Sequence, residues 1–177
     1  MRTTRIAIGL LVMCFSLSCG SSYNIKAQQP ASPKLGKYKK VYIGWLDLHE
    51  NNWRNLGYKS PGEWSKAIRE LNVDSLQAYC RDKLSGRTVT GSRGADAAPA
   101  GSLYVKPVLT YHDVRSGLNR IQYLHLNVTF TDTATGAALY TARVVVDTSG
   151  FGFGNYTLEG QLNFGMKNLA GFIGSKF

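Results

Sequence analysis

Residues 122–147 have the sequence QYLHLNVTFTDTATGAALYTARVVVD, and this stretch decides the fold. Its first part alternates apolar and more polar residues, which is the pattern of a strand with one buried face. The apolar positions are Leu124, Leu126, Val128 and Phe130. Residues 131–136 then predict a hairpin connection in which Gly136 takes a positive φ. Residues 138–147 predict the return strand, so the stretch indicates an antiparallel hairpin that is covered on one side.

Further elements are expected on both sides of this hairpin. They are strands at 41–48, 87–92 and 103–111, a helix at 60–84 that is interrupted near residue 72, and a helix at 158–177. Ser60, Pro61 and Glu63 form a capping box at the start of the first helix. Pro107 lacks a backbone donor, which favours a sheet edge or a bulge. The order β-α-β-β-β-β-α predicts an α+β fold: a two-layer sandwich of a mainly antiparallel sheet with two helices on one face.

The N-terminus has the layout of an export signal. Arg2 and Arg5 precede an apolar run at residues 6–17, and small residues follow that run. The run is about a dozen residues long, whereas a helix that spans a bilayer needs about 20. Cys19 comes directly after Ser18, at the point where cleavage is expected.

This arrangement resembles the signal of bacterial lipoproteins, although Leu17 lies one place nearer to the cysteine than the family prefers. The resemblance implies a signal peptide at 1–18 and a lipidated Cys19. Gly, Ser, Gln and Pro residues then indicate a flexible tether through residue 38, followed by one α+β domain at 39–177. The alternative is ordinary cleavage after Ala27, which would give a soluble periplasmic or secreted protein.

The body of the chain has a weaker resemblance, carried by its long capped helix, the hairpin at 130–136 and the terminal helix. It looks like small exported lipoproteins of uncharacterised function from Gram-negative envelopes, and some of these resemble accessory domains of envelope machines. The resemblance implies an outer-membrane location, on the periplasmic or the surface side.

The positive charge of the chain bears on its partners. The net charge is +10, and removal of Arg2 and Arg5 with the signal leaves +8. Export excludes nucleic acid as the usual partner of such a chain, and leaves anionic lipids, anionic envelope polymers or an acidic protein. Four lysines next to the anchor are candidate contacts for an anionic surface, and a merely solvated surface is the alternative. They are Lys34, Lys37, Lys39 and Lys40.

Residues that could carry catalysis are few. Asp47, His49 and Glu50 cluster after the first strand, and His112 ends the strand at 103–111. Histidine is a common metal ligand, but no His-x-x-x-His spacing and no second cysteine support a zinc site. We therefore expect a non-enzymatic binding or assembly module without metal or cofactor. The alternative is a small envelope hydrolase, or a metal-dependent enzyme, that uses these four residues.

Two further features concern apolar side chains. Phe151 and Phe153 alternate with glycines, and they form a candidate loop for apolar contact with a partner or a bilayer. Cys80 shares a helical apolar face with Leu76 and Leu84, so we expect a buried thiol that makes no disulfide.

Overall fold

The computed structural model describes residues 23–30, 33–48, 59–71, 75–92, 95–115, 120–149 and 157–177. The strands are β1 (Tyr23–Gln29), β2 (Lys40–Gly44), β3 (Asp47–Leu48), β4 (Thr88–Ser92), β5 (Leu103–Arg115), β6 (Arg120–Asp132) and β7 (Ala138–Asp147). The helices are α1 (Pro61–Leu71), α2 (Gln77–Lys83) and α3 (Leu158–Gly174), with a short 3-10 turn at Ala95–Ala97. None of the helices in these ranges is long and apolar enough to cross a membrane.

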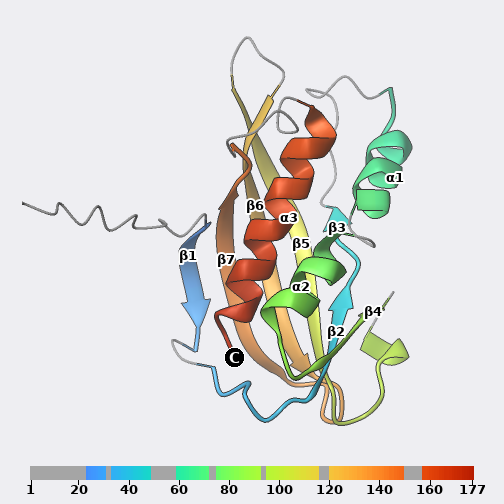
Figure 1. Ribbon diagram of the computed structural model, residues 1–177, viewed down its shortest axis with the longest axis vertical. Helices are drawn as coiled ribbons and strands as arrows, with labels where there is room; N and C mark the ends of the chain where they lie inside the picture. The colour runs from blue at the N-terminus through green and yellow to red at the C-terminus, as the bar shows by residue number, and fades with distance from the viewer. Residues whose placement is uncertain are drawn as a thin grey trace, which may run out of the picture.

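The strands form one sheet in the order β1-β7-β6-β5-β2-β4, and β3 continues alongside β5 beyond the end of β2. The long ladders β1–β7, β7–β6 and β6–β5 are antiparallel, whereas the short ladders that β2 and β3 make are parallel. Figure 1 shows α3 and α2 in front of this sheet, with α1 to the right of it near β3. The predicted two-layer α+β sandwich is therefore confirmed.

The hairpin of β6 and β7 forms as its sequence predicts. Its four apolar β6 positions are fully buried, and so are three of their four counterparts on β7: Tyr140, Val144 and Val146. The fourth, Ala142, is 5% exposed. The Phe130 ring packs edge-on against Tyr140, with ring centroids 5.3 Å apart. Gly136 has a φ of 69°, and its N–H donates to the carbonyl of Asp132 at 2.8 Å. The alternation of apolar residues thus sets both the register and the buried face.

Pro107 does not lie on an edge strand, because β5 is in the interior of the sheet between β6 and β2. On one side Pro107 is opposite Val128 of β6. On the other side, the β2 ladder ends at Val105 and the β3 ladder begins at Val108. Pro107, which has no backbone N–H to donate, therefore lies beside the break between β2 and β3. The edge prediction was wrong for this reason.

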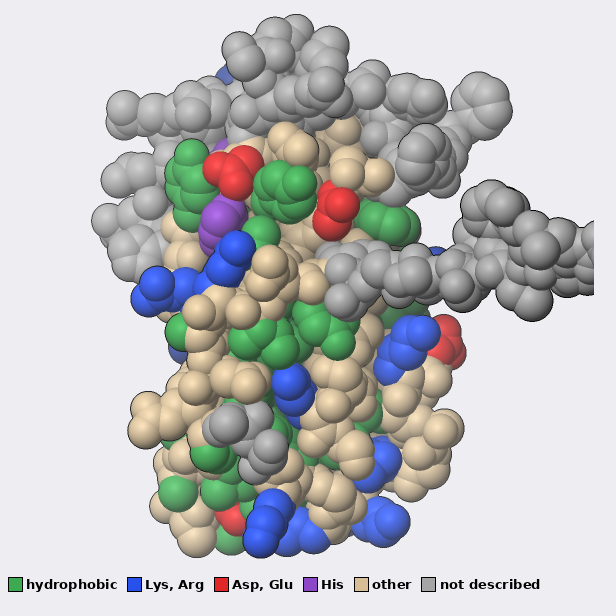
Figure 2. Space-filling model, turned by 90° about the vertical axis from the view of Figure 1, so that its left-hand side faces the viewer, with side chains coloured by type: hydrophobic (Ala, Val, Ile, Leu, Met, Phe, Trp, Pro, Cys, Tyr) green, Lys and Arg blue, Asp and Glu red, His purple; other side chains and the backbone are tan. Residues whose placement is uncertain are grey.

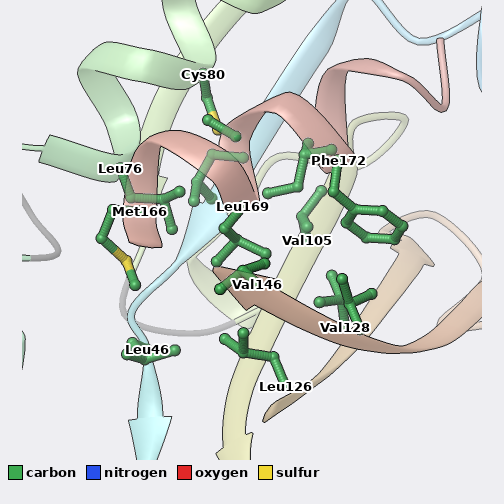
Figure 3. Close-up of a cluster of buried hydrophobic side chains, with 14 of the residues drawn as sticks. Leu46, Leu76, Cys80, Val105, Leu126, Val128, Val146, Met166, Leu169 and Phe172 are labelled. Carbon is green, nitrogen blue, oxygen red and sulfur yellow. The ribbon is translucent and has the colours of Figure 1, made fainter. Parts of the chain in front are cut away.

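The predicted first helix is divided into α1 and α2. At its start, Glu63 N–H donates to Ser60 Oγ at 3.2 Å, and the Glu63 carboxylate accepts from Lys59 N–H at 3.0 Å. Helix α1 ends at Leu71, and residues 72–74 lie outside the described residues. Cys80 on α2 is a fully buried free thiol, as predicted. In Figure 3 it points toward α3 and the residues around Leu169.

Helix α3 packs very closely on β6. A β-carbon at Gly165 would lie 2.9 Å from Leu124 Cδ1 and 3.1 Å from Thr148 Cγ2, so the glycine permits this approach. The side chain of Thr157 caps the helix, accepting from Gly160 N–H at 3.0 Å. Met166, Leu169 and Phe172 then fill the space between α3 and the sheet (Figure 3).

The segment at 19–38, expected as a flexible tether, differs from that expectation. Residues 23–29 are strand β1, paired with β7 from Tyr23 opposite Val146 to Gln29 opposite Thr141. The Tyr23 ring packs edge-on against Phe172 at 5.6 Å, and the Tyr140 hydroxyl donates to Gln28 Oε1 at 2.6 Å.

The chain after β1 is also part of the folded domain. Leu35 and Tyr38 are buried, and the Tyr38 hydroxyl donates to Asp132 at 2.5 Å. The folded domain therefore includes residues well before the expected boundary at 39. The expected signal peptide at 1–18 lies outside the described residues.

Candidate binding face

The sheet has one face that the described helices do not cover, which we call the open face. The helices pack on the side of the sheet where the apolar β6 residues point. The intervening β6 residues point to the open face and are at least partly exposed: Tyr123, His125, Asn127 and Thr129. A site on this face is accessible to a large ligand.

A β-bulge in β5 shapes one end of the open face. Leu109 is opposite Leu126 and Tyr111 is opposite His125, so Thr110 is an extra residue on β5. Its hydroxyl donates to the carbonyl of His125 at 3.0 Å. The extra residue reverses the alternation of side chains along β5.

The bulge assembles what we call the Tyr111 cluster: Tyr111, Asp113, Tyr123 and His125. His125 Nε2 lies 2.7 Å from Asp113 Oδ2, and both side chains are partly exposed. Tyr111 is 53% exposed, and its ring meets that of His125 edge-on at 5.3 Å. An aromatic ring beside a histidine–carboxylate pair can stack on an apolar surface and donate hydrogen bonds at the same place.

A groove of about 420 Å³ lies on the same side of the sheet, across β1, β7 and β6. The residues that line it include Ala27, Gln29, Asn127, Thr129, Thr141 and Arg143. Arg143 is exposed, and it makes no ion pair or hydrogen bond within the described ranges. No described carboxylate lines the groove. Its guanidinium, hydroxyl and amide groups suit a polar or anionic ligand.

The four predicted lysines lie at the other end of the molecule from the start of β1. All four are exposed, Lys40 begins β2, and Lys37 Nζ lies 4.9 Å from the centre of the Tyr38 ring. We call this region the basic end. Figure 2 shows Lys and Arg side chains gathered there, at the bottom of the view. Strand β1 separates the lysines from the predicted anchor by about 20 Å, at roughly 3.3 Å per residue.

Arg87 and Lys176 also belong to the basic end. Arg87 Nε donates to the carbonyl of Tyr38 at 3.1 Å, and its guanidinium lies over the Phe177 ring at 4.7 Å. Lys176 Nζ lies 5.3 Å from the Tyr140 ring centre, and burial lowers its pKa. The basic end therefore combines lysines in solvent with cations that pack on aromatic rings.

The described part of the structure does not bring together the residues that we considered for a hydrolase or a metal site. Asp47 is opposite Val108 in the β3–β5 ladder, whereas His49 and Glu50 lie outside the described residues. His112 is 95% buried instead of being a solvated strand-end residue, because the bulge turns it toward the Trp64 ring at 5.8 Å. Within the described ranges, no group of three or more His, Cys, Asp or Glu residues could hold a metal.

His112 and Cys80 are two of the buried titratable groups of the core, which also include Tyr38 and Tyr140. Burial lowers the pKa of His112, and the nearby Asp113 opposes this shift to a smaller extent. Among the described residues, His112 Nδ1 has no hydrogen-bond partner. Burial raises the pKa of the Cys80 thiol to about 12. Both groups are therefore neutral near pH 7.

Three predicted site residues, Cys19, Phe151 and Phe153, lie outside the described residues. Conversely, the sequence analysis did not single out Tyr111, Asp113 or Arg143. Alternation along 122–130 correctly predicted the outward direction of His125. The position of Asp113 beside it depends on the bulge at Thr110, which no residue pattern indicates.

Comparison with known proteins identifies no family. No family model and no curated protein matches the chain. Among solved structures, PelC from Paraburkholderia phytofirmans, a dodecamer, is 11% identical over 83% of this chain and 96% of its own, with a TM-score of 0.49. A Xanthomonas campestris protein of family DUF330 is 13% identical over 83% and 89%, with a TM-score of 0.47.

A homolog of a neuraminyllactose-binding hemagglutinin from Helicobacter pylori is 10% identical over 82% of this chain and 86% of its own, with a TM-score of 0.42. Likenesses of this size do not extend to what this chain binds. Its function has to be inferred from its own residues.

Proposed function

We propose that the chain is an exported, lipid-anchored envelope protein that acts as a non-enzymatic binding module, with its ligand on the open face. The observation that carries this proposal is the groove around Arg143, on the face that the described helices leave uncovered. The groove has the volume of a small-ligand site, and it opens onto a surface that could take a longer polymer.

The chemistry of the groove favours a polar, anionic envelope component. Arg143 offers paired N–H donors that suit a carboxylate or a phosphate, and Thr129, Thr141 and Asn127 offer hydroxyl and amide groups to a ligand rich in oxygen. The described acidic side chains of the open face already have partners: Asp113 pairs with His125, and Asp147 accepts from Ser149. Among the described residues, no carboxylate lines the groove that could repel an anionic ligand.

Strand β1 supports lipidation at Cys19 over cleavage after Ala27. Cleavage there would remove Tyr23–Ala27, which is five of the seven residues of β1. Two of the removed residues, Tyr23 and Ile25, pack against the core. A mature chain that begins at Cys19 keeps the whole strand, whereas a chain that begins at Gln28 loses an edge of the sheet.

Site-specific photo-crosslinking in cells tests the binding face. A photoreactive amino acid at position 129 or 141 would lie in the groove, and one at position 167 would lie on the exposed side of α3. We expect adducts from the groove positions and not from position 167, and Arg143→Gln should reduce them several-fold. Equal adducts from all three positions, or adducts insensitive to Arg143→Gln, would contradict the proposed site.

A further inference from the structure

The register of the sheet shows where the anchor joins the domain. Tyr23, the first residue of β1, is opposite Val146 of β7, and Val146 is opposite Leu124 of β6. These three residues form one row across the sheet. Strand β1 runs in the same direction as β6, because both are antiparallel to β7. The chain before Tyr23 therefore joins the domain at the end of the sheet where β6 begins.

The hairpin of β5 and β6 projects beyond this row. Strand β6 begins at Arg120, four residues before Leu124, and the last pair of the ladder is Arg115 opposite Arg120. Because Gln122 is an extra residue on β6, only three ladder pairs follow the row, and at roughly 3.3 Å per residue the hairpin extends about 10 Å past the row of Tyr23. Figure 1 shows this hairpin rising above the start of β1.

The chain from the anchor to the sheet is short enough to limit where the membrane can lie. Cys19 is four residues before Tyr23. Even a fully extended chain covers at most about 3.6 Å per residue, so Cys19 can be no more than about 14 Å from Tyr23. This limit holds for any conformation of those residues. Measured from the row of Tyr23, a lipidated Cys19 therefore lies at most about 4 Å beyond the last ladder pair of the hairpin.

From this match of lengths, we propose that the end of the β5–β6 hairpin, at Arg115 and Arg120, contacts the headgroups of the membrane that holds the anchor. The proposal rests on the lipid anchor of the proposed function. Two arginines at the last ladder pair complement anionic headgroups. Tyr111 and Tyr123 follow on the open face near this end, and tyrosine suits the boundary between membrane and water.

In this orientation, the basic end lies on the side of the domain that faces away from the membrane. Lys34 and the lysines after it follow the far end of β1, whereas Arg120 is beyond its near end. In this orientation the lysines do not meet the headgroups beside the anchor, and they are available to an anionic partner in the envelope. The competing orientation lays the β1 edge flat on the bilayer, which would bring the basic end and the hairpin equally close to it.

Fluorescence quenching on vesicles separates these orientations. The mature chain from Cys19 would be coupled through that thiol to a maleimide lipid, in vesicles of phosphatidylcholine and phosphatidylglycerol with a nitroxide-labelled headgroup. Cys80 is fully buried, so coupling is selective, and Cys19→Ser is the control for it. A fluorescent amino acid would be placed at position 120 or, as the matched distal site, at position 40. Melting curves would verify that both variants fold.

We expect quenching at position 120 to be several-fold stronger than at position 40. With the fluorophore at position 120, Arg115→Glu should weaken the quenching, whereas Lys37→Glu should leave it unchanged. Equal quenching at the two positions, stronger quenching at position 40, or none at position 120 would each overturn the inference. Because the coupling is chemical, this result does not depend on lipidation in cells. Intact mass of the native protein tests lipidation separately.

Discussion

His112 and Asp113 are adjacent in the chain, but their side chains lie on opposite faces of the sheet. Asp113 pairs with His125 on the open face, at 2.7 Å, whereas His112 is buried beside Trp64. The bulge at Thr110 sets this division, because it reverses the alternation that begins at Leu103. One inserted residue therefore supplies both a polar pair for the binding face and a histidine for the core.

The buried histidine makes stability depend on pH. Because burial lowers the pKa of His112 in the folded protein, the unfolded chain binds a proton more readily in the pH range between the two values. The free energy of unfolding should therefore fall as the pH drops below about 6.5, the ordinary pKa of histidine. Chemical denaturation between pH 7 and pH 5 measures this effect.

The variant His112→Phe should flatten that pH dependence, because no proton can then be taken up at this position. The matched control is His125→Gln, which removes a partly exposed histidine and should keep the dependence. If the two variants show the same pH profile, His112 is not the group responsible.

Cys80 should resist alkylation in the native protein and react only on unfolding, because it is fully buried and its pKa is about 12. Cys80→Ala should cost on the order of 1 kcal/mol of stability, as for a small truncation in a core. Mass spectrometry after a timed alkylation, with and without denaturant, gives the answer. Rapid labelling of the native thiol would rule out the buried position.

Gly136→Val should lower the melting temperature more than Ala134→Val does. Gly136 has a φ of 69°, a conformation that costs a residue with a β-carbon roughly 1 kcal/mol. A β-carbon there would meet no atom within 4 Å, so the cost comes from the backbone alone. Ala134 is exposed in the same turn and is the matched control. Equal thermal stability of the two variants would count against a strained backbone at 136.

Cys19→Ala should move the protein from the membrane fraction to the soluble fraction. The physical reason is that, in the proposed function, acyl chains bound to this residue supply the membrane affinity. Intact mass of the wild type should show a mature chain that begins with an acylated Cys19. A mature protein that begins at Gln28 and carries no lipid would contradict this prediction.

The lysines of the basic end should affect membrane binding only when the anchor is absent. In the Cys19→Ala protein, replacement of all four with Gln should weaken binding to anionic liposomes, and added salt should have the same effect. In the lipid-anchored protein the same replacement should leave membrane binding unchanged, because the lysines face away from the bilayer. Flotation assays at low salt would measure liposome binding with and without the four lysine replacements, first in the Cys19→Ala protein and then in the lipid-anchored protein.

The sequence was informative wherever side chains divide cleanly between core and solvent. Leu124 to Phe130 predicted the central strand and its buried face, and Ser60 with Glu63 predicted the start of α1. Strand β1 was missed because an edge strand exposes most of its side chains. Tyr23 and Ile25 are its large apolar residues that pack against the core, and the rest of its composition is that of a tether.

Most of the candidate site could not be predicted in the same way. Arg143 alternates with buried residues on β7, which gives its direction, but the groove around it exists only because β1 pairs next to β7. Likewise, Pro107 is accommodated by a break between β2 and β3 that depends on strands distant in the sequence. Contacts of this kind have no local signature.

The pairing of β1 with β7 also determines how the protein would respond to a pull. A partner bound to Arg143 of β7 would draw the rest of the domain away from the bilayer, along the axis of β1. The hydrogen bonds of an antiparallel ladder are perpendicular to the strands, so that force would load the whole β1–β7 ladder in shear. A sideways pull on Tyr23 would instead break the pairs one after another. The domain should therefore resist axial tension better than peeling, and single-molecule force spectroscopy along the two directions would measure the difference.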